Sequence, residues 1–430
     1  MLSRDYHLPF VLLAGLGLLS ACAAGGPGDT RLAKTSEGTS ASPVLAEPVM
    51  VDAEPAAISS ARIAPSHPHR PPRAGIVTAG DIDDTRNFAA FRSYLKRKGG
   101  SERPFSRPVL VQLSGPDGKP APGVYYTLRK PGAKEPFHTG YSGVDGHINA
   151  FPKALGAGQP QNVELRLFAE DQDGTTVRDL RTGPTRHKIV LARNTAWKPA
   201  FLDLVFVVDT TGSMGDELDW LTREMREIVK TARRAAPGVD IRYGLVAYRD
   251  HGDAYVLRNL GFTGSARTMQ GWLDRQRANG GGDYPEAAAA ALQSAVSLNW
   301  RRGKGERIVI HIADAPPHSR DANRYLDAAR AAARRNIQVY GLGASGVGDE
   351  AEILMRQAAA MTSGRYLFLT DDSGVGHAHA EPDIACYRVT RLKTLMINVL
   401  KSELSGIRHE ATAQQVVREV GAYRRGVCLN

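Results

Sequence analysis

The spacing of apolar positions changes near residue 200, and the two parts of the chain predict different elements. Between residues 104 and 196, short runs with strand character, such as 109–113 and 162–168, are separated by turn signals. From residue 200 to 405, apolar runs of strand length alternate with segments of helical spacing. The sequence therefore predicts a small β-sandwich followed by an α/β domain with a doubly wound, mostly parallel sheet.

Two predicted strands of the second part, 201–208 and 308–313, are nearly continuous apolar runs, as is typical of strands covered on both faces. The predicted strands span residues 201–208, 239–248, 254–260, 308–313, 338–342 and 365–369, and a last helix is predicted over 384–402. We expect His311, inside one of these strands, to lie in the core.

The loop after the first of these strands carries a carboxylate and two hydroxyls at alternate positions, Asp209, Thr211 and Ser213. In open α/β sheets, ligands bind beyond the carboxyl ends of the strands. Hard oxygen ligands of this kind suit Mg²⁺. The alternative is that Asp209 and Ser213 only cap the following helix, with Asp216 completing a box-like pair.

Two later segments favour a metal site. The sequences DTTGSM at 209, GGGDYPEAA at 280 and IHIADAPPH at 310 together resemble the metal-ion-dependent adhesion site of a von Willebrand factor type A (VWA) domain. The resemblance covers about residues 200–405 and implies a Rossmann-like fold. It also implies that Asp209, Thr211, Ser213 and Asp314 hold a divalent cation. Mg²⁺ is preferred, while Mn²⁺ and Ca²⁺ remain open.

The glycine-rich loop departs from the common form of the family, which supplies a threonine there. Asp283 is our candidate for the remaining ligand. The alternative is that a glycine takes the threonine position and Asp283 only supports the loop. Asp250 could also lie near this edge, although the turn chemistry of residues 249–253 explains it without a site.

In the family, the metal keeps one position for a carboxylate from a partner protein. We therefore expect a non-catalytic module for adhesion or assembly that binds an acidic group of a protein. The alternative is a metal-dependent hydrolase, for which His251 and His318 are the available histidines. No nucleophile elbow or zinc-ligand spacing supports it. The chain has no GxxxxGK[ST] motif, so we expect no nucleotide.

Composition changes this picture little. The chain has 430 residues, with 42% apolar and 23% charged residues, as is ordinary for globular proteins. Its net charge of +10 would suit nucleic acid, but the basic residues are scattered along predicted helices. They do not interleave with aromatic residues as in a stacking platform, so we expect no nucleic-acid partner.

The N-terminus predicts export and anchoring. Arg4 precedes an apolar stretch over residues 9–19, and Leu19-Ser20-Ala21-Cys22 resembles the lipobox of bacterial lipoproteins. Residues 1–21 would be the signal peptide, and a lipidated Cys22 would hold the protein to a membrane of the bacterial envelope. Ala23 favours the outer over the inner membrane, with a periplasmic or surface-exposed protein. An ordinary secretory signal is the alternative.

The remaining segments connect these parts. Residues 22–79 are rich in Ala, Pro, Ser, Gly and Thr and predict a disordered tether, followed by a short helical segment over 80–103. The sequences DGKPAPGVYYTLR and YSGVDGHI within the predicted sandwich resemble immunoglobulin-like or transthyretin-like modules of bacterial surface proteins.

The C-terminal tail, residues 406–430, contains one of the two cysteines left once Cys22 is lipidated. We expect Cys386 and Cys428 to form a disulfide that ties this tail to the last helix. Two free buried thiols are the alternative.

Overall fold

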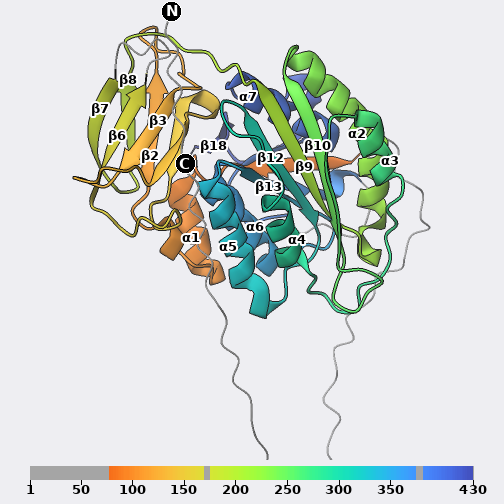
Figure 1. Cartoon of the computed structure of the whole chain (residues 1–430). Coiled ribbons are helices and arrows are strands. Elements are labelled where there is room, and N and C mark those ends of the chain that lie inside the picture. Colours follow the sequence, from red (N-terminus) through yellow and green to blue (C-terminus); the bar gives the residue numbers. More distant parts are fainter. Residues whose placement is uncertain (1–76, 169–174, 374–380, 430) are drawn as a thin grey trace, which may run out of the picture. The chain divides into compact units, whose positions relative to one another are not determined.

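A mixed nine-stranded sheet forms the centre of the protein (Figure 1). The computed structural model describes residues 77–168, 175–373 and 381–429. The strand order is β11-β10-β9-β12-β13-β14-β1-β15-β16. The strands are β1 (Thr78–Ile82), β9 (Phe201–Asp209), β10 (Asp240–Tyr248), β11 (Leu257–Thr263), β12 (Glu306–Ala313), β13 (Gln338–Gly343), β14 (Tyr366–Leu369), β15 (Tyr387–Arg391) and β16 (Val416–Val420).

The middle of this sheet is parallel and largely buried. Strands β10, β9, β12, β13 and β14 run in one direction, so their carboxyl ends meet at one edge. Every residue of β9 is buried, as its nearly continuous apolar sequence predicts. In register, Asp209 at the end of β9 lies next to Tyr248 of β10. This edge is where the candidate site forms.

Helices cover both faces of the sheet (Figure 1). They are α1 (Phe88–Lys98), α2 (Gly215–Ala235), α3 (Ala266–Leu273), α4 (Ala288–Val296), α5 (Ala322–Arg334), α6 (Asp349–Thr362) and α7 (Leu392–Ser405). Val205 and Val207 of β9 pack in one core with α1, α4, α5 and α6. Leu204 and Phe206, on the opposite face, pack with α2, α3 and α7. None of the helices in the described ranges combines the length and apolar character needed to span a bilayer.

The α/β class predicted from the sequence is confirmed, but three boundaries change. The sheet is mixed, because β1, β15 and β16 join one edge in antiparallel pairs and β11 pairs antiparallel with β10 at the other edge. Strand β1 therefore begins before the predicted tether ends at residue 79 and lies outside the predicted domain of 200–405. Its sequence TAGDI has little strand signal, and pairing with β14 and β15 determines its structure. Gly80 is required there, since a Cβ would lie 2.6 Å from the Phe368 ring.

The last helix is also shorter than predicted. It begins at Leu392, because residues 387–391 form β15 between β1 and β16. The predicted tail over 406–430 contributes β16 to the sheet, followed by a hairpin of β17 (Tyr423–Arg424) and β18 (Val427–Cys428).

Residues 104–196 form two smaller sheets, which we call the two-sheet region. One sheet has the order β5-β2-β8 and the other β4-β3-β6-β7. The strands are β2 (Val109–Ser114), β3 (Tyr125–Arg129), β4 (His138–Tyr141), β5 (His147–Ala150), β6 (Asn162–Phe168), β7 (Thr175–Arg181) and β8 (Arg186–Val190). Val111 of β2 and Leu165 of β6 belong to one hydrophobic core, so the two sheets pack on each other. The resemblance to immunoglobulin-like or transthyretin-like modules stays a prediction.

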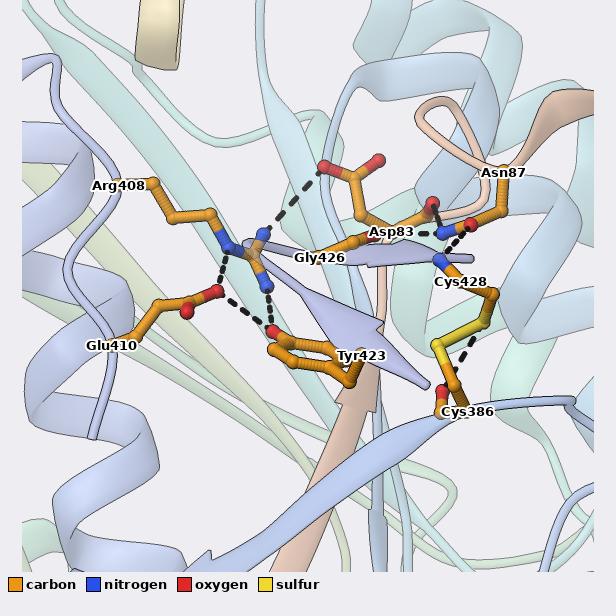
Figure 2. Close-up of a disulfide and its surroundings, with 8 residues drawn as sticks. All are labelled: Asp83, Asn87, Cys386, Arg408, Glu410, Tyr423, Gly426 and Cys428. Atoms are coloured by element: carbon orange, nitrogen blue, oxygen red, sulfur yellow. Dashed lines mark hydrogen bonds and ion pairs between the residues drawn. A yellow bond between two sulfur atoms is a disulfide. The ribbon is translucent and has the colours of Figure 1, made fainter. Parts of the chain in front are cut away.

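A disulfide joins the C-terminal hairpin to the sheet (Figure 2). It links Cys386, next to β15, to Cys428 of β18, with Cα atoms 5.3 Å apart. Asn87 holds the same hairpin through two hydrogen bonds: its Nδ2 donates to Gly426 O at 2.7 Å, and its Oδ1 accepts from Cys428 N at 2.9 Å. The hairpin is thus fixed at its turn and at β18.

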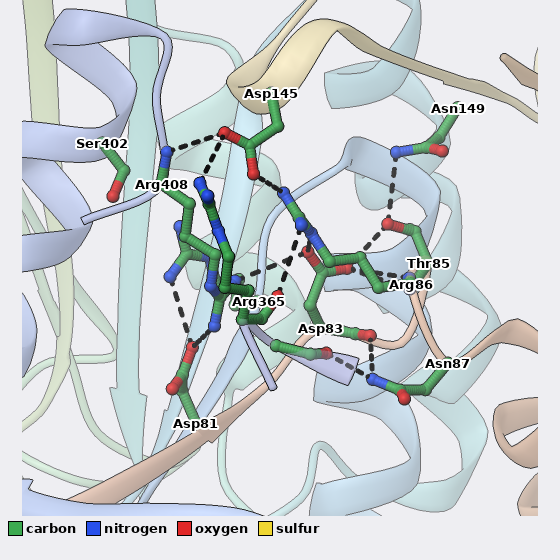
Figure 3. A network of polar contacts seen from close by, with 12 residues as sticks. Asp81, Asp83, Thr85, Arg86, Asn87, Asp145, Asn149, Arg365, Ser402 and Arg408 are labelled. Atoms are coloured by element: carbon green, nitrogen blue, oxygen red, sulfur yellow. Dashed lines mark hydrogen bonds and ion pairs between the residues drawn. The ribbon is translucent and has the colours of Figure 1, made fainter. Parts of the chain in front are cut away.

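A buried ionic network lies beside this hairpin (Figure 3). We call it the arginine network; its members are Asp81, Asp83, Arg86, Asp145, Arg365, Arg408 and Glu410. Arg408 is 3.3 Å from Asp81 and 2.8 Å from Glu410, and its backbone N donates to Asp145 Oδ1 at 3.0 Å. Because Asp145 belongs to the two-sheet region, the network connects that region to the central sheet.

Candidate functional site

The loop after β9 folds around the carboxyl of Asp209. Both the backbone N and the hydroxyl of Thr211 donate to Asp209 Oδ1, at 2.9 and 2.7 Å. The hydroxyls of Thr211 and Ser213 are 3.4 Å apart. Thr211 precedes the short 3₁₀ turn Gly212–Met214, yet its side chain makes no capping hydrogen bond. The loop therefore gathers three polar side chains of the predicted set in one place.

Asp209 is fully buried, and its charge is not compensated. Within residues 77–429 as far as the structure describes them, its Oδ2 has no hydrogen-bond partner. Burial first, and the charge of Asp314 second, raise the pKa of Asp209 to about 7. Asp314 directly follows β12 at the same edge of the sheet and is itself buried. The structure thus brings Asp209 and Asp314 together as predicted from the sequence.

The glycine-rich loop packs directly on this group. Gly281 has φ +76°, and a Cβ there would lie 3.3 Å from Thr211 Cβ and 3.0 Å from Glu286 Oε1. Gly212 N donates to Gly280 O at 3.0 Å. Only residues without a side chain allow the loop to approach this closely.

The buried carboxyl of this loop is Glu286, while Asp283 is exposed. Burial, followed by the charge of Asp209, raises the pKa of Glu286 to about 9. No hydrogen bond or ion pair among the described residues joins Asp283 to the other four predicted ligands. Our sequence interpretation missed Glu286, although it ends the same GGGDYPE motif.

The neighbouring loop at residues 249–253 is held by local hydrogen bonds. Asp253 Oδ2 accepts from Asp250 N at 3.1 Å and from Gly281 N at 3.0 Å, so this turn also anchors the glycine-rich loop. His318 Nε2 lies 2.7 Å from Asp250 Oδ1. A hydrolase that uses Ser213 as its nucleophile would need a histidine beside that hydroxyl. His318 instead contacts Asp250, and Ser213 contacts Thr211, so these contacts do not support the hydrolase alternative.

The fit of these side chains to a divalent cation depends on which ligand atoms they offer. Among the residues that the structure describes, no three or more Asp, Glu, His or Cys side chains are arranged so that they could hold a metal ion. The candidate set instead combines two carboxylates, Asp209 and Asp314, with the hydroxyls of Thr211 and Ser213. Its buried, unpartnered Asp209 Oδ2 and its uncompensated negative charge are what a cation would satisfy. The chemistry of this donor set therefore fits a divalent cation.

Comparison with known proteins identifies the domain that carries this site. Residues 203–377 match the family model described as von Willebrand factor A domain. These residues form a VWA domain. The prediction of a VWA domain is therefore confirmed, and domains of this kind commonly mediate protein interactions.

Several proteins are similar to this chain over the VWA domain. An alpha-protein kinase, vwkA of Dictyostelium discoideum, is 31% identical over 173 residues, which is 36% of this chain and 27% of the kinase. The human von Willebrand factor A domain-containing protein 7 is 38% identical over 93 residues, 22% of this chain and 10% of that protein. The chain thus spans about a quarter or less of these relatives. Because the matches lie in the VWA region, they do not show enzymatic activity for this chain.

Two solved structures are also similar. A conserved hypothetical protein, BatB of Bacteroides thetaiotaomicron, has 17% identity and a TM-score of 0.31, covering 42% of this chain and 91% of its own. The VWA-type domain of the type V pili tip protein Mfa5 of Porphyromonas gingivalis has 12% identity and a TM-score of 0.30, covering 40% and 90%.

Proposed function

We propose that the VWA domain binds a partner protein through a divalent cation held by Asp209, Thr211, Ser213 and Asp314. One observation carries the proposal: Asp209 is fully buried beside Asp314, and among the described residues its Oδ2 has no partner. A bound cation would supply the missing positive charge and accept a carboxylate from the partner. The protein would serve adhesion or assembly without catalysing a reaction.

The chemistry of the site favours Mg²⁺. Two carboxylates and two hydroxyls leave room for several waters, which Mg²⁺ retains readily. Asp283 is omitted from the proposed set, because its side chain is exposed while Glu286 is the buried carboxyl of the same loop. Mn²⁺ and Ca²⁺ are distinguished by direct titration.

The anchor is a separate part of this proposal. We infer that Cys22 is lipidated and that the protein is attached to a membrane of the bacterial envelope, preferentially the outer membrane. Cys22 lies outside the described residues, so this part rests on the LSAC sequence alone. Replacing Cys22 with Ala should release the protein from washed membranes, and continued membrane attachment of the variant would refute the anchor.

Affinity capture from solubilised envelopes tests the binding function. The full-length protein is used with Mg²⁺, with Mg²⁺ and a chelator, and as the Asp209→Ala variant with Mg²⁺. We expect a partner only in the first condition. Asp283→Asn is the matched control, since it removes one exposed carboxylate from the neighbouring loop and should retain the partner. A partner that persists in all conditions would refute a metal-bridged contact.

A further inference from the structure

The hydroxyl of Tyr284, in the glycine-rich loop, is hydrogen-bonded to two other loops. It accepts from Gly348 N at 2.6 Å, and its own hydrogen has two backbone acceptors, Asp314 O at 3.2 Å and Gly346 O at 3.4 Å. Asp314 follows β12, while Gly346 and Gly348 lie between β13 and α6. The side chain therefore reaches from its own loop past a candidate ligand of the cation to the loop before α6.

Both of the loops that Tyr284 joins are anchored at a second point. In the glycine-rich loop, Glu286 N donates to Pro316 O at 2.9 Å. In the loop before α6, Ser345 N donates to Glu217 Oε1 at 3.1 Å, which attaches this loop to α2. The Tyr284 hydroxyl is thus held between two fixed loops, and the ring cannot turn away without breaking its hydrogen bonds.

The ring of this fixed side chain faces solvent. Tyr284 is 49% exposed, although its hydroxyl is hydrogen-bonded inside the loops. Of the exposed large hydrophobic side chains in the described ranges, three lie in the two-sheet region and three in the segment 407–429, so Tyr284 alone lies in a loop of the candidate site. Single exposed apolar residues are ordinary, but a ring that is already held in place loses little conformational entropy when a partner covers it.

A carboxylate that completes the coordination of a cation held by Asp209 and Asp314 has to approach close to this ring. The Tyr284 hydroxyl is 3.2 Å from the backbone oxygen of Asp314, so the ring and the donor set share one small area of the surface. Tyrosine is enriched in the core of protein interfaces and among the residues that contribute most to binding. Covering a half-exposed ring with an apolar side chain also removes apolar surface from water.

The charges around the ring decide which kind of side chain fits there. Asp283 directly precedes Tyr284 and is exposed, and the exposed Glu350 lies two residues beyond Gly348. A second carboxylate on the partner would be repelled by these acids. An apolar side chain meets no such repulsion and covers the ring.

We propose that Tyr284 is a contact residue for the partner of the VWA domain, and that this partner presents its carboxylate next to an apolar side chain that packs on the Tyr284 ring. The inference rests on the proposed function, because it requires a cation that accepts the partner's carboxylate. It adds selectivity to that function: the cation accepts a carboxylate, and the ring selects what stands beside it.

A photocrosslinker at position 284 tests the contact and its chemistry directly. Full-length protein with p-benzoylphenylalanine in place of Tyr284 is irradiated with solubilised envelopes in Mg²⁺ and in chelator, and crosslinked peptides are identified by mass spectrometry. We expect a Mg²⁺-dependent crosslink to a peptide with Asp or Glu beside an apolar side chain. Crosslinks that form equally in chelator, or a crosslinked peptide without this acidic and apolar pair, would overturn the proposal.

Capture of the partner by variants separates the ring from its hydroxyl. Tyr284→Ser should lower the amount of Mg²⁺-dependent partner about tenfold or more, whereas Tyr284→Phe keeps the ring and should stay within about threefold of wild type. Val417→Ser is the matched control, since Val417 is 54% exposed on β16, and it should retain the partner. A loss in Tyr284→Phe as large as in Tyr284→Ser would overturn the role of the ring.

Calorimetric titration with Mg²⁺ distinguishes this inference from the proposed function. Tyr284→Ser should bind Mg²⁺ within about twofold of wild type, because its side chain is not part of the donor set. An affinity about tenfold lower would place Tyr284 in the cation site and overturn the contact role. Wild-type protein that binds no Mg²⁺, Mn²⁺ or Ca²⁺ would refute the proposed function, whereas normal cation binding with equal capture by wild type and Tyr284→Ser would refute the contact alone.

Discussion

The protein buries acidic side chains in two places, and the surroundings shift their pKa values in opposite directions. In the arginine network, Asp145 is buried, yet hydrogen bonds from Arg408 and Arg86 hold its pKa below the usual value against the effect of burial (Figure 3). At the candidate site, burial and neighbouring carboxylates raise the pKa of Asp209 to about 7 and of Glu286 to about 9. One cluster contains its own counter-charges, and the other gathers acidic groups.

This difference in charge compensation suggests a structural role for the arginine network and a functional role for the candidate site. Buried carboxylates that pair with arginines connect segments distant in sequence, and their charge is already neutralised within the protein. Buried carboxylates that meet each other destabilise the fold unless they bind a proton or a cation. Perturbed pKa values of this second kind cluster at functional sites. The comparison therefore supports the proposal that the sheet edge with Asp209 binds a cation.

The largest effect is expected in the arginine network. Arg408→Met should lower the free energy of unfolding by about 3–5 kcal/mol, because it removes the buried guanidinium that pairs with Asp81 and Glu410 and leaves Asp81 paired with Arg365. Urea unfolding measures it, with and without Mg²⁺, and the loss should be the same in both. Arg424→Met, on an exposed position of β17, is the control and should cost less than about 0.5 kcal/mol. A loss under 1 kcal/mol in Arg408→Met would mean that the network is not structural.

The pH dependence of stability distinguishes the two clusters further. Folded Asp209 and Glu286 keep protons up to about pH 7 and 9, whereas the unfolded chain releases them near pH 4. The folded state then binds more protons in this window, so without divalent cation the stability should fall as pH rises from about 4 to 9. Asp209→Asn should remove the part between about pH 4 and 7, on the order of 4 kcal/mol. A wild-type stability that rises over this window would contradict the uncompensated charge.

Removing the disulfide should have the next largest effect. The double variant Cys386→Ser, Cys428→Ser opens a link between residues 42 apart, and loops of this length correspond to about 2–4 kcal/mol. Unfolding in urea measures the stability, and the affinity for Mg²⁺ should be unchanged, because the hairpin lies beside the arginine network and not at the site. A changed affinity would contradict the separation of the two regions.

The smallest effect concerns Asp283. Because its side chain is exposed, Asp283→Asn should change the free energy of unfolding by less than about 0.5 kcal/mol and leave the affinity for Mg²⁺ within about twofold. Thermal unfolding and calorimetry measure the two quantities. A tenfold loss of affinity would restore Asp283 as a ligand, as we first predicted from the sequence.

The sequence predicted the parts that local patterns encode. The buried run at 201–208 and the motifs that follow it identified the VWA domain, and the end of β9 lies where the sheet edge was expected. The sequence did not predict β1, because TAGDI has no strand pattern and becomes a strand only by pairing with β14 and β15. Glu286 was missed for a related reason: which acid of GGGDYPE is buried depends on how the loop packs on Thr211.

Calorimetric titration of Mg²⁺ into the full-length protein and into Asp209→Asn tests the central claim most directly, namely that the uncompensated carboxylates form a cation site. The account predicts saturable binding of about one ion by the wild type and no measurable binding by the variant. Wild-type protein that shows no saturable binding of Mg²⁺, Mn²⁺ or Ca²⁺, or a variant that binds as tightly as wild type, would contradict it.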